Sequence, residues 1–323
     1  PYTVNQEGHG PAWANSLFED NAEFGFGMNL AVTQRRNKLA DTVGALIAVP
    51  YCDEEIQAAG KEWLEGKDDA EASKAAGAKL LSACKAVLDA RGDCDCDACK
   101  LAREVVAGAD LLTKKSIWIF GGDGWAYDIG YGGLDHVLAQ GEDVNVLVLD
   151  TEVYSNTGGQ ASKSTPTGSV AKFAAAGKRT RKKDLGLMAM SYGYVYVAQV
   201  AMGADMNQLI KAMTEAEAYK GPSLIIAYAP CINHGIKMNQ AQAEIKKAVA
   251  AGYWTMYRYN PDLENPLTVD SKDPTESYQD FIKGENRYAS LLRQFPDVAP
   301  ALFEESETEA RKRLENYKRM AGK

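Results

Sequence analysis

The 323-residue sequence has no excess of positive charge, few histidines and no long apolar run, and each shortage excludes a class of function. Its formal net charge is −8, so we expect neither a nucleic-acid nor a membrane partner, since both require a basic surface. The longest apolar stretches, such as 224–228, are far too short to cross a bilayer. The histidines, His9, His136 and His234, are too scattered in sequence to suggest a metal triad.

The chain also lacks an initiator methionine, because it begins at Pro1 in a Gly- and Asn-containing segment that reads as a loop. No charged and apolar leader opens it, so we expect no secretory signal and a cytoplasmic location. We further expect the chain to be a segment of a longer polypeptide. Its length and its ordinary apolar and charged fractions, 46% and 25%, predict a globular protein of one large domain or two modest ones.

Two short apolar runs, 117–120 and 144–149, each end in a loop that carries an acid. The first is followed by G-G-D-G and the second by D-T, and both runs match buried parallel strands. Ligands bind at the carboxyl ends of the strands in open parallel sheets. The two oxygen-rich loops therefore predict a site for a hard cation and the phosphates that it carries.

Three groups in these loops are the predicted magnesium ligands: the Asp123 carboxylate, the Thr151 hydroxyl and the Val153 carbonyl. A magnesium ion takes about six oxygens near 2.1 Å, some of them from substrate phosphates and water. Gly122 and Gly124 flank the acid and remove Cβ atoms where the backbone must turn tightly beside a diphosphate.

Simpler interpretations exist for the same residues. Asp123 is also typical of a structural turn, Thr151 of a helix cap, and Asn156 of an Asx turn before glycines. A dinucleotide site is excluded, because Tyr127 stands where G-x-G-x-x-G requires its third glycine. No G-x-x-x-x-G-K-[ST] phosphate loop is present either; 159–164 only approximates one.

The G-D-G sequence, with a side-chain oxygen 28 positions after Asp123, resembles the thiamine diphosphate motif of transketolase-like enzymes. That motif usually closes with Asn-Asn, whereas this chain has Asp150-Thr151. Together with G-G-D-G-W-A-Y-D-I-G, D-T-E-V-Y-S-N-T-G-G-Q and A-P-C-I-N-H-G, this departure resembles the pyruvate:ferredoxin (flavodoxin) oxidoreductases. The likeness runs from P-A-W-A-N-S-L-F-E-D near the start to E-N-R-Y-A-S-L-L-R-Q-F-P near the end.

The resemblance implies oxidative decarboxylation of pyruvate to acetyl-CoA and CO2, with electrons passed through iron-sulfur clusters to ferredoxin or flavodoxin. It implies thiamine diphosphate, Mg2+ and a [4Fe-4S] cluster as cofactors, and pyruvate and coenzyme A as substrates in a homodimer. This chain would be the carboxyl-terminal part, inactive alone, because the Glu that activates the cofactor lies on the missing N-terminal part. The alternatives are another thiamine-dependent 2-oxoacid oxidoreductase, a non-redox thiamine decarboxylase or synthase, or a purely structural module.

The resemblance also assigns residues to roles. Asn156 would be catalytic, placed near the reactive ring of the cofactor and the substrate, and Cys231 would be one ligand of the [4Fe-4S] cluster. The three companion ligands of Cys231 would precede Pro1. The expected cofactor-binding residues are Gly122, Asp123, Gly124, Trp125, Thr151, Glu152, Val153, Tyr154, Ser155 and Asn156.

Strands and helices alternate along the chain, which predicts an α/β fold with a doubly wound parallel sheet. The resemblance makes this the thiamine diphosphate-binding fold, with a helical insertion and a helical C-terminal extension. We also expect a helix at 15–24 with a turn at 24–27, a short helix at 168–176, and a strand at 253–259. The expected parts are an N-terminal segment of the thiamine diphosphate-binding domain at 1–32, a helical insertion at 33–113, the diphosphate/Mg-binding core at 114–260 and the extension at 261–323.

Two further clusters leave alternatives open. Cys94, Cys96 and Cys99 have the tight spacing of a soft-metal site, which Cys84 or Cys231 would complete. Their place among aspartates in the insertion favours exposed reduced thiols or a local disulfide instead. The basic run at 178–183 suits an acidic electron carrier, but such runs are more often a solvated face, which is the interpretation we favour.

Overall fold

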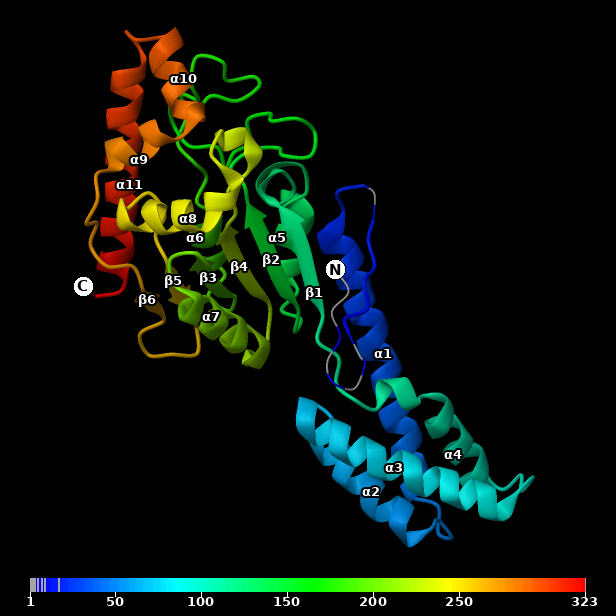
Figure 1. Cartoon of the computed structure of the whole chain (residues 1–323). Coiled ribbons are helices and arrows are strands. Elements are labelled where there is room, and N and C mark those ends of the chain that lie inside the picture. The colour runs from blue at the N-terminus through cyan, green and yellow to red at the C-terminus, as the bar shows by residue number, and fades with distance from the viewer. Residues whose placement is uncertain (1–3, 5, 7, 9, 17, 323) are drawn as a thin grey trace. The chain divides into compact units, whose positions relative to one another are not determined.

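The structure, a computed structural model, describes residues 4, 6, 8, 10–16 and 18–322 (Figure 1). Pro1 and His9 lie outside the described residues. The chain divides into two compact units, one formed by Phe26–Ile117 and the other by Pro1–Gly25 together with Trp118–Lys323. We call them the helical unit and the α/β unit.

The helical unit consists of helices joined by short turns, and its sequence sets where they begin. Asp53 and Asp69 cap two of the helices by accepting hydrogen bonds from the backbone N–H groups of Glu55 and Ala72. The helix that enters the unit starts in the α/β unit. The elements are α1 (Asn21–Ile47), α2 (Glu54–Gly66), α3 (Ala70–Arg91), α4 (Asp97–Ala107) and the 3-10 turn η1 (Ala109–Leu111).

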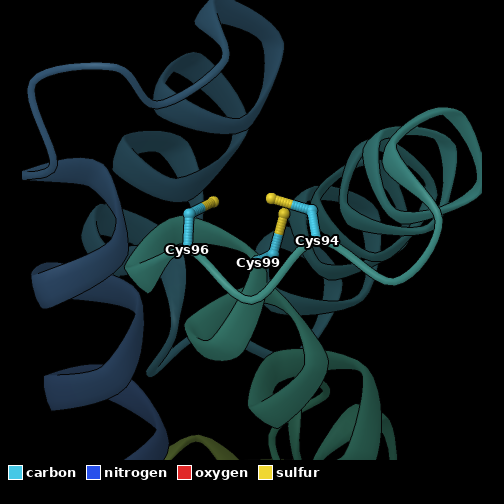
Figure 2. Close-up of side chains that lie close together, drawn as sticks. All are labelled: Cys94, Cys96 and Cys99. Atoms are coloured by element: carbon cyan, nitrogen blue, oxygen red, sulfur yellow. The ribbon is translucent and has the colours of Figure 1, made fainter.

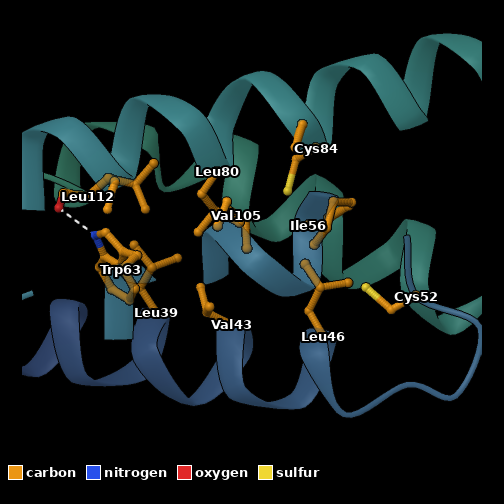
Figure 3. Packing of buried hydrophobic residues seen from close by; sticks show 14 of the residues in the cluster. Leu39, Val43, Leu46, Cys52, Ile56, Trp63, Leu80, Cys84, Val105 and Leu112 are labelled. Atoms are coloured by element: carbon orange, nitrogen blue, oxygen red, sulfur yellow. Dashed lines mark hydrogen bonds between the residues drawn. The ribbon is translucent and has the colours of Figure 1, made fainter. Parts of the chain in front are cut away.

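The core of the helical unit is a cluster of aliphatic side chains around one indole (Figure 3). Trp63 is fully buried, and its Nε1 donates a hydrogen bond to the carbonyl oxygen of Leu112 at 2.8 Å. At Gly60 a Cβ atom would lie 2.6 Å from the Ile47 side chain, so the glycine lets α1 and α2 approach closely. The buried members include Leu39, Val43, Leu46, Ile56, Trp63, Leu80, Cys84 and Val105.

The α/β unit contains a six-stranded sheet in the order β1-β2-β4-β3-β5-β6. The first four strands are parallel, whereas β5 and β6 run antiparallel at one edge. Side chains from alternate positions of β3 cover both faces: Ala198 and Val200 pack with α7 (Met206–Ala218), and Val197 faces α6 (Leu185–Met190). The strands are β1 (Trp118–Gly122), β2 (Asn145–Asp150), β3 (Tyr196–Val200), β4 (Ser223–Tyr228), β5 (Tyr257–Tyr259) and β6 (Leu267–Val269).

Helices alternate with the first strands of the α/β unit, and the described elements that follow the last strand, β6, in the sequence are helices. None of the helices in the described part of the chain combines the length and apolar character that a bilayer crossing requires. They are the π-helix η2 (Gly124–Ile129), α5 (Tyr131–Ala139), α6 (Leu185–Met190), α7 (Met206–Ala218), η3 (Ile232–His234), η4 (Met238–Gln240), α8 (Ala241–Ala250), α9 (Tyr278–Gly284), α10 (Asn286–Gln294) and α11 (Ala299–Met320).

Three sequence-based expectations about these elements are wrong. The helix expected at 15–24 begins only at Asn21 and continues through the expected turn. Gly25 lies within this helix. A Cβ atom there would lie 2.4 Å from the Ile119 side chain, so the residue is glycine because the helix packs closely, not because the chain turns. The helix expected at 168–176 is irregular, since left-handed φ angles at Gly168 and Phe173 interrupt it. The strand expected at 253–259 is confined to β5 and is antiparallel.

Candidate cofactor site at the carboxyl ends of the strands

The order of the strands places three loops side by side. β1, β2 and β4 are neighbours, with Gly122 paired to Leu149 and Asp150 paired to Tyr228. The loops that follow them carry Asp123, Thr151 and Cys231. The sheet thus brings together residues that are separated by more than a hundred positions in the chain.

The three predicted magnesium ligands converge in one place. Thr151 Oγ1 lies 2.7 Å from Asp123 Oδ1 and 2.9 Å from the carbonyl oxygen of Val153. Both neighbours are acceptors, and a hydroxyl has only one proton to donate, so it cannot make a full-strength hydrogen bond to each. A cation held by all three oxygens would resolve this conflict. The donor set therefore fits a hard divalent ion.

Asp123 is the charged member of this set, and its surroundings favour a cation. Its side chain is 1% exposed, and Oδ2 accepts a hydrogen bond from Ser162 Oγ at 2.6 Å. Burial, and then the nearby carboxylate of Asp150, raise the pKa of Asp123 to about 7. A bound cation would favour the ionised carboxylate and so lower the pKa of Asp123, whereas burial and Asp150 raise it.

The glycines beside Asp123 serve two different purposes. A Cβ at Gly124 would lie 2.5 Å from the ring of Tyr154, so this glycine lets the two loops pack together. A Cβ at Gly122 would meet only the Leu149 carbonyl oxygen, at 4.0 Å, and the space before it is open. Gly122 therefore leaves open space at the backbone, and the phosphate expected there stays a prediction. Trp125 is buried and packs against Gly121, which supports the turn from behind.

Glu152 bends the chain between Thr151 and Val153. Its φ angle is +58°, a left-handed conformation that is uncommon for a residue other than glycine. The carboxylate is buried and accepts hydrogen bonds from Lys182 at 3.0 Å, Arg287 at 2.8 Å and Tyr253 at 2.5 Å. Although burial raises its pKa, Lys182 and Arg287 together hold the pKa of Glu152 at about 2. Its N–H donates to Asp150 Oδ1 at 3.0 Å and its carbonyl oxygen accepts from Thr165 Oγ1 at 2.7 Å. Glu152 thus positions the loop, and the cofactor contact expected of it stays a prediction.

Lys182 corrects the expectation that the basic run at 178–183 is a solvated face. Its side chain is 11% exposed, and Nζ lies 2.8 Å from Asp150 and 3.0 Å from Glu152. It also donates to Ser164 Oγ at 2.7 Å. Asp150 and Glu152, at the end of β2, are buried and need a positive counter-charge, and Lys182 of the basic run supplies it. Arg181, the adjacent residue, is exposed.

A second buried network joins the loop after β4 to the loop after β2. His234 Nε2 lies 2.8 Å from the carbonyl oxygen of Thr151, and Nδ1 lies 3.6 Å from Glu285. Glu285 in turn accepts a hydrogen bond from Arg287 Nε at 2.6 Å. Sequence reasoning missed Glu285 and Arg287, although both belong to the E-N-R stretch that carries part of the resemblance.

Tyr154, Ser155 and Asn156 lie in a tight loop after Val153. The loop is closed by hydrogen bonds from Tyr154 N to the Gln160 carbonyl oxygen at 2.9 Å and from Gly159 N to the Tyr154 carbonyl oxygen at 2.7 Å. Asn156 is exposed at its tip. The contact roles expected for these residues stay predictions.

Cys231 is buried beside the same loop. Its Sγ lies 2.8 Å from Ser155 Oγ, and the backbone N and side-chain Nδ2 of Asn233 are each 3.5 Å from it. Donors directed at one sulfur suit a thiolate that ligates iron, since hydrogen bonds to the sulfurs are a feature of iron-sulfur sites. Cys231 belongs to the α/β unit, whereas the other five cysteines belong to the helical unit.

A cavity of about 210 Å3 opens beside these loops. It is lined by Val153, Gly159, Lys172, Asn233 and His234, among others. The loops after β2 and β4 therefore enclose space next to the predicted magnesium ligand Val153.

Two family models match this chain. Residues 102–227 match the thiamine pyrophosphate enzyme, C-terminal TPP binding domain. Residues 35–93 match the insertion domain of pyruvate-ferredoxin oxidoreductase. The α/β unit, with its oxygen donors at the carboxyl ends of β1 and β2, thus contains most of the region that matches a thiamine pyrophosphate-binding domain.

The relatives narrow this class further. Pyruvate:ferredoxin oxidoreductase of Moorella thermoacetica is 60% identical over 99% of this chain and 27% of its own length. Pyruvate-flavodoxin oxidoreductase of Klebsiella pneumoniae is 55% identical over 100% of this chain and 27% of its own length. The mitochondrial NADP(+) pyruvate dehydrogenase of Euglena gracilis is 46% identical, with 99% and 18% covered. The chain is thus related over nearly its whole length to a segment of the pyruvate:ferredoxin (flavodoxin) oxidoreductases, and the resemblance carried by its motifs is confirmed.

Proposed function

We propose that this chain is the diphosphate- and magnesium-binding part of a pyruvate:ferredoxin (flavodoxin) oxidoreductase, which converts pyruvate and coenzyme A to acetyl-CoA and CO2. One observation carries the proposal: Asp123, Thr151 and Val153 bring three oxygens together at the carboxyl ends of β1 and β2. These oxygens lie within the region that matches the thiamine pyrophosphate-binding domain.

The residues at this edge divide the work of holding the cofactor. Asp123, Thr151 and Val153 hold Mg2+, and the open backbone at Gly122 lets the diphosphate approach. Gly124, Trp125, Tyr154 and Ser155 complete the pocket, with Glu152 fixing the bend of the loop. Thiamine diphosphate, when bound, supplies the carbanion that attacks the substrate carbonyl. Asn156, exposed at the tip of its loop, is the neutral donor to charge that develops on the pyruvate carbonyl oxygen.

Cys231 provides one ligand of a [4Fe-4S] cluster that takes electrons from this site. Its burial and the donors of Asn233 support this role. The remaining ligands come from polypeptide outside the chain. Ferredoxin or flavodoxin is the proposed electron acceptor, in a cytoplasmic homodimer. The name of the Euglena relative includes NADP(+), so the electron acceptor differs among the relatives of this chain.

Another part of the enzyme covers this edge of the sheet. Three large apolar side chains on the loops and short helical turns that follow the strands are exposed: Phe173 at 93%, Ile232 at 74% and Ile129 at 68%. The chain spans only 27% of the length of the Moorella and Klebsiella oxidoreductases, and the proposal is that other polypeptide of the same enzyme covers these side chains. The proposal places the Glu that activates the cofactor on that part, and the 323-residue chain alone does not turn over pyruvate.

The test compares Asp123→Asn with Asp128→Asn in the complete enzyme. Asp128, five residues further on, pairs with Lys163 at 2.9 Å and takes no part in the proposed site. Asp123→Asn should weaken magnesium-dependent thiamine diphosphate binding at least about 10-fold, since loss of even an outer-shell partner costs a metal site that much. Pyruvate-dependent reduction of ferredoxin should fall with it, and Asp128→Asn should leave both largely intact. Equal effects of the two substitutions would contradict the site.

Iron and acid-labile sulfide analysis separates the proposed function from a non-redox thiamine decarboxylase or synthase, which needs no Cys231. The complete enzyme should contain a cluster that Cys231→Ser reduces or removes. An enzyme without iron that still decarboxylates pyruvate would support the non-redox alternative. Measurable pyruvate decarboxylation by the isolated chain would refute the claim that it is half of a site.

A further inference from the structure

Three cysteines of the helical unit meet at one point on its surface. The sulfur atoms of Cys94, Cys96 and Cys99 all lie within 4.8 Å of one another, and Figure 2 shows the three side chains turned toward a common space. Cys99 is buried, and the other two are half-buried. The cluster falls between the two matched regions, 35–93 and 102–227, so neither family model includes it.

The backbone brings these sulfurs together without any help from a metal. Cys96 is the N-cap residue of α4 and Cys99 lies in its first turn, so their side chains share one side of the helix end. Cys94 precedes them in the turn that follows α3, where its N–H donates to the carbonyl oxygen of Arg91 at 3.2 Å. Arg103 of α4 reaches back and donates to the carbonyl oxygen of Cys94 at 2.7 Å. Hydrogen bonds to residues of α3 and α4 thus hold the backbone of this turn in place.

The spacing of the sulfurs suits thiolate ligands of one ion. Zinc–sulfur bonds of about 2.3 Å at tetrahedral angles place the sulfurs about 3.8 Å apart. The limit of 4.8 Å on all three separations allows this arrangement with little movement. All three cysteines are free, so no disulfide joins any two of them. Thiols are weak hydrogen-bond donors and acceptors, and mutual hydrogen bonds give little reason for three of them to gather.

The charges around the cluster also suit a metal–thiolate group. Three thiolates and one divalent cation have a net charge of −1. A guanidinium nitrogen of Arg91, the last residue of α3, lies 4.0 Å from Cys96 Sγ and supplies the opposite charge. Asp93, Asp95 and Asp97 alternate with the first two cysteines, and Asp95, the one between them, is paired with Lys100 at 3.2 Å. The cluster therefore has a cation beside its sulfurs and a neutralised carboxylate beside its turn.

We propose that Cys94, Cys96 and Cys99 bind one Zn2+ ion through three thiolates, with the fourth position open to water or another small ligand. This differs from the interpretation as exposed thiols or a local disulfide that the sequence favours. Three protein ligands and an open position also distinguish it from a closed four-cysteine structural site. The ion would fasten the end of α3 to the beginning of α4, and it would do so independently of the proposed cofactor site.

Zinc titration of the freshly reduced 323-residue chain tests this proposal. A chromophoric zinc chelator serves as competitor, and all proteins carry Cys231→Ser so that this thiol does not contribute. We expect one equivalent of tightly bound Zn2+, with affinity at least about 10-fold lower in Cys94→Ser and in Cys96→Ser. Cys52→Ala, in the same unit but outside the cluster, should bind as the parent does. Cobalt substitution should give a thiolate-to-metal absorption band that Cys94→Ser loses.

Cys94 is the deciding position, because its side chain is half-buried in the turn before α4, so Cys94→Ser should leave the packing of the helices unchanged. Circular dichroism checks that each variant keeps its helices. Several results would overturn the proposal: a reduced chain that takes up no zinc, zinc uptake that is equal in the parent and in Cys94→Ser, a disulfide within the cluster in anaerobically purified protein, or an iron-sulfur cluster on these cysteines.

Discussion

Both units of this chain have an apolar core, but among the described residues the α/β unit also buries a network of ion pairs. The helical unit encloses an aliphatic cluster around Trp63, whereas the α/β unit buries Asp150, Glu152, Lys182 and Arg287 at the ends of its strands. Apolar burial stabilises a fold with little demand on geometry, but buried ion pairs contribute little net stability and require their partners in place. The first core supports a shape, and the second fixes the positions of loops that carry function.

Replacing Lys182 by Met should break the polar core and give the largest loss. Asp150 and Glu152 would remain buried without their shared counter-charge. Removing one partner of a buried ion pair costs about 3–5 kcal/mol, because the remaining charge is left uncompensated. Urea unfolding of the chain should show this loss for the transition of the α/β unit.

Arg181→Met is the matched control, since it removes a neighbouring cation of the same run from an exposed position. It should change the free energy of unfolding by no more than about 0.5 kcal/mol. If the two substitutions cost the same, Lys182 would be part of a solvated face after all, as the sequence suggests.

Replacing Leu80 by Ala should break the apolar core of the helical unit. Leu80 is fully buried in the aliphatic cluster, and such truncations cost about 2–5 kcal/mol from lost burial and the cavity left behind. Leu80→Met keeps the volume and should cost less than about 1.5 kcal/mol. Denaturation followed by far-ultraviolet circular dichroism measures both losses. A Met variant as unstable as the Ala variant would show that this core, too, depends on exact shape.

Sequence patterns predicted the part of the site that is local. The strands at the two apolar runs, the acid after the first and the oxygens at Thr151 and Val153 all follow from short stretches, and the fold places these oxygens together. Each stretch contains its own strand, turn and side chain. Their meeting requires only that parallel strands end at the same edge of a sheet.

The residues that hold those loops could not be predicted in the same way. Arg287, in α10, follows Glu152 by 135 positions, and the two side chains are brought together by the tertiary fold. No local sequence pattern reveals such a contact. Lys182 stands in a run whose members differ in burial, with Arg181 exposed and Lys178 and Lys183 half-buried, so composition does not distinguish it. Gly25 was wrongly predicted to lie in a turn, because in sequence a glycine that allows close packing cannot be distinguished from one that makes a turn.

Replacing Gly124 by Ala should disturb the loops without touching a ligand. The added Cβ would lie 2.5 Å from the ring of Tyr154, so the ring or the backbone must move. Overpacking of this kind costs about 1–3 kcal/mol. Gly132→Ala, in α5 with no atom within 4 Å of its Cβ, should be neutral or stabilise the protein by up to about 1 kcal/mol. Thermal unfolding compares the two, and equal melting temperatures would refute close packing at Gly124.

Gly122→Ala should have the smallest effect on stability and separate support from function most clearly. Its added Cβ would meet only the Leu149 carbonyl oxygen, at 4.0 Å, so the free energy of unfolding should change by no more than about 0.5 kcal/mol. If the space before Gly122 receives the diphosphate, the same methyl group must nevertheless weaken magnesium-dependent thiamine diphosphate binding in the complete enzyme. Calorimetric titration of that enzyme measures the affinity, and unchanged binding would show that the diphosphate lies elsewhere. A loss of binding without a loss of stability would identify function as the reason for this glycine.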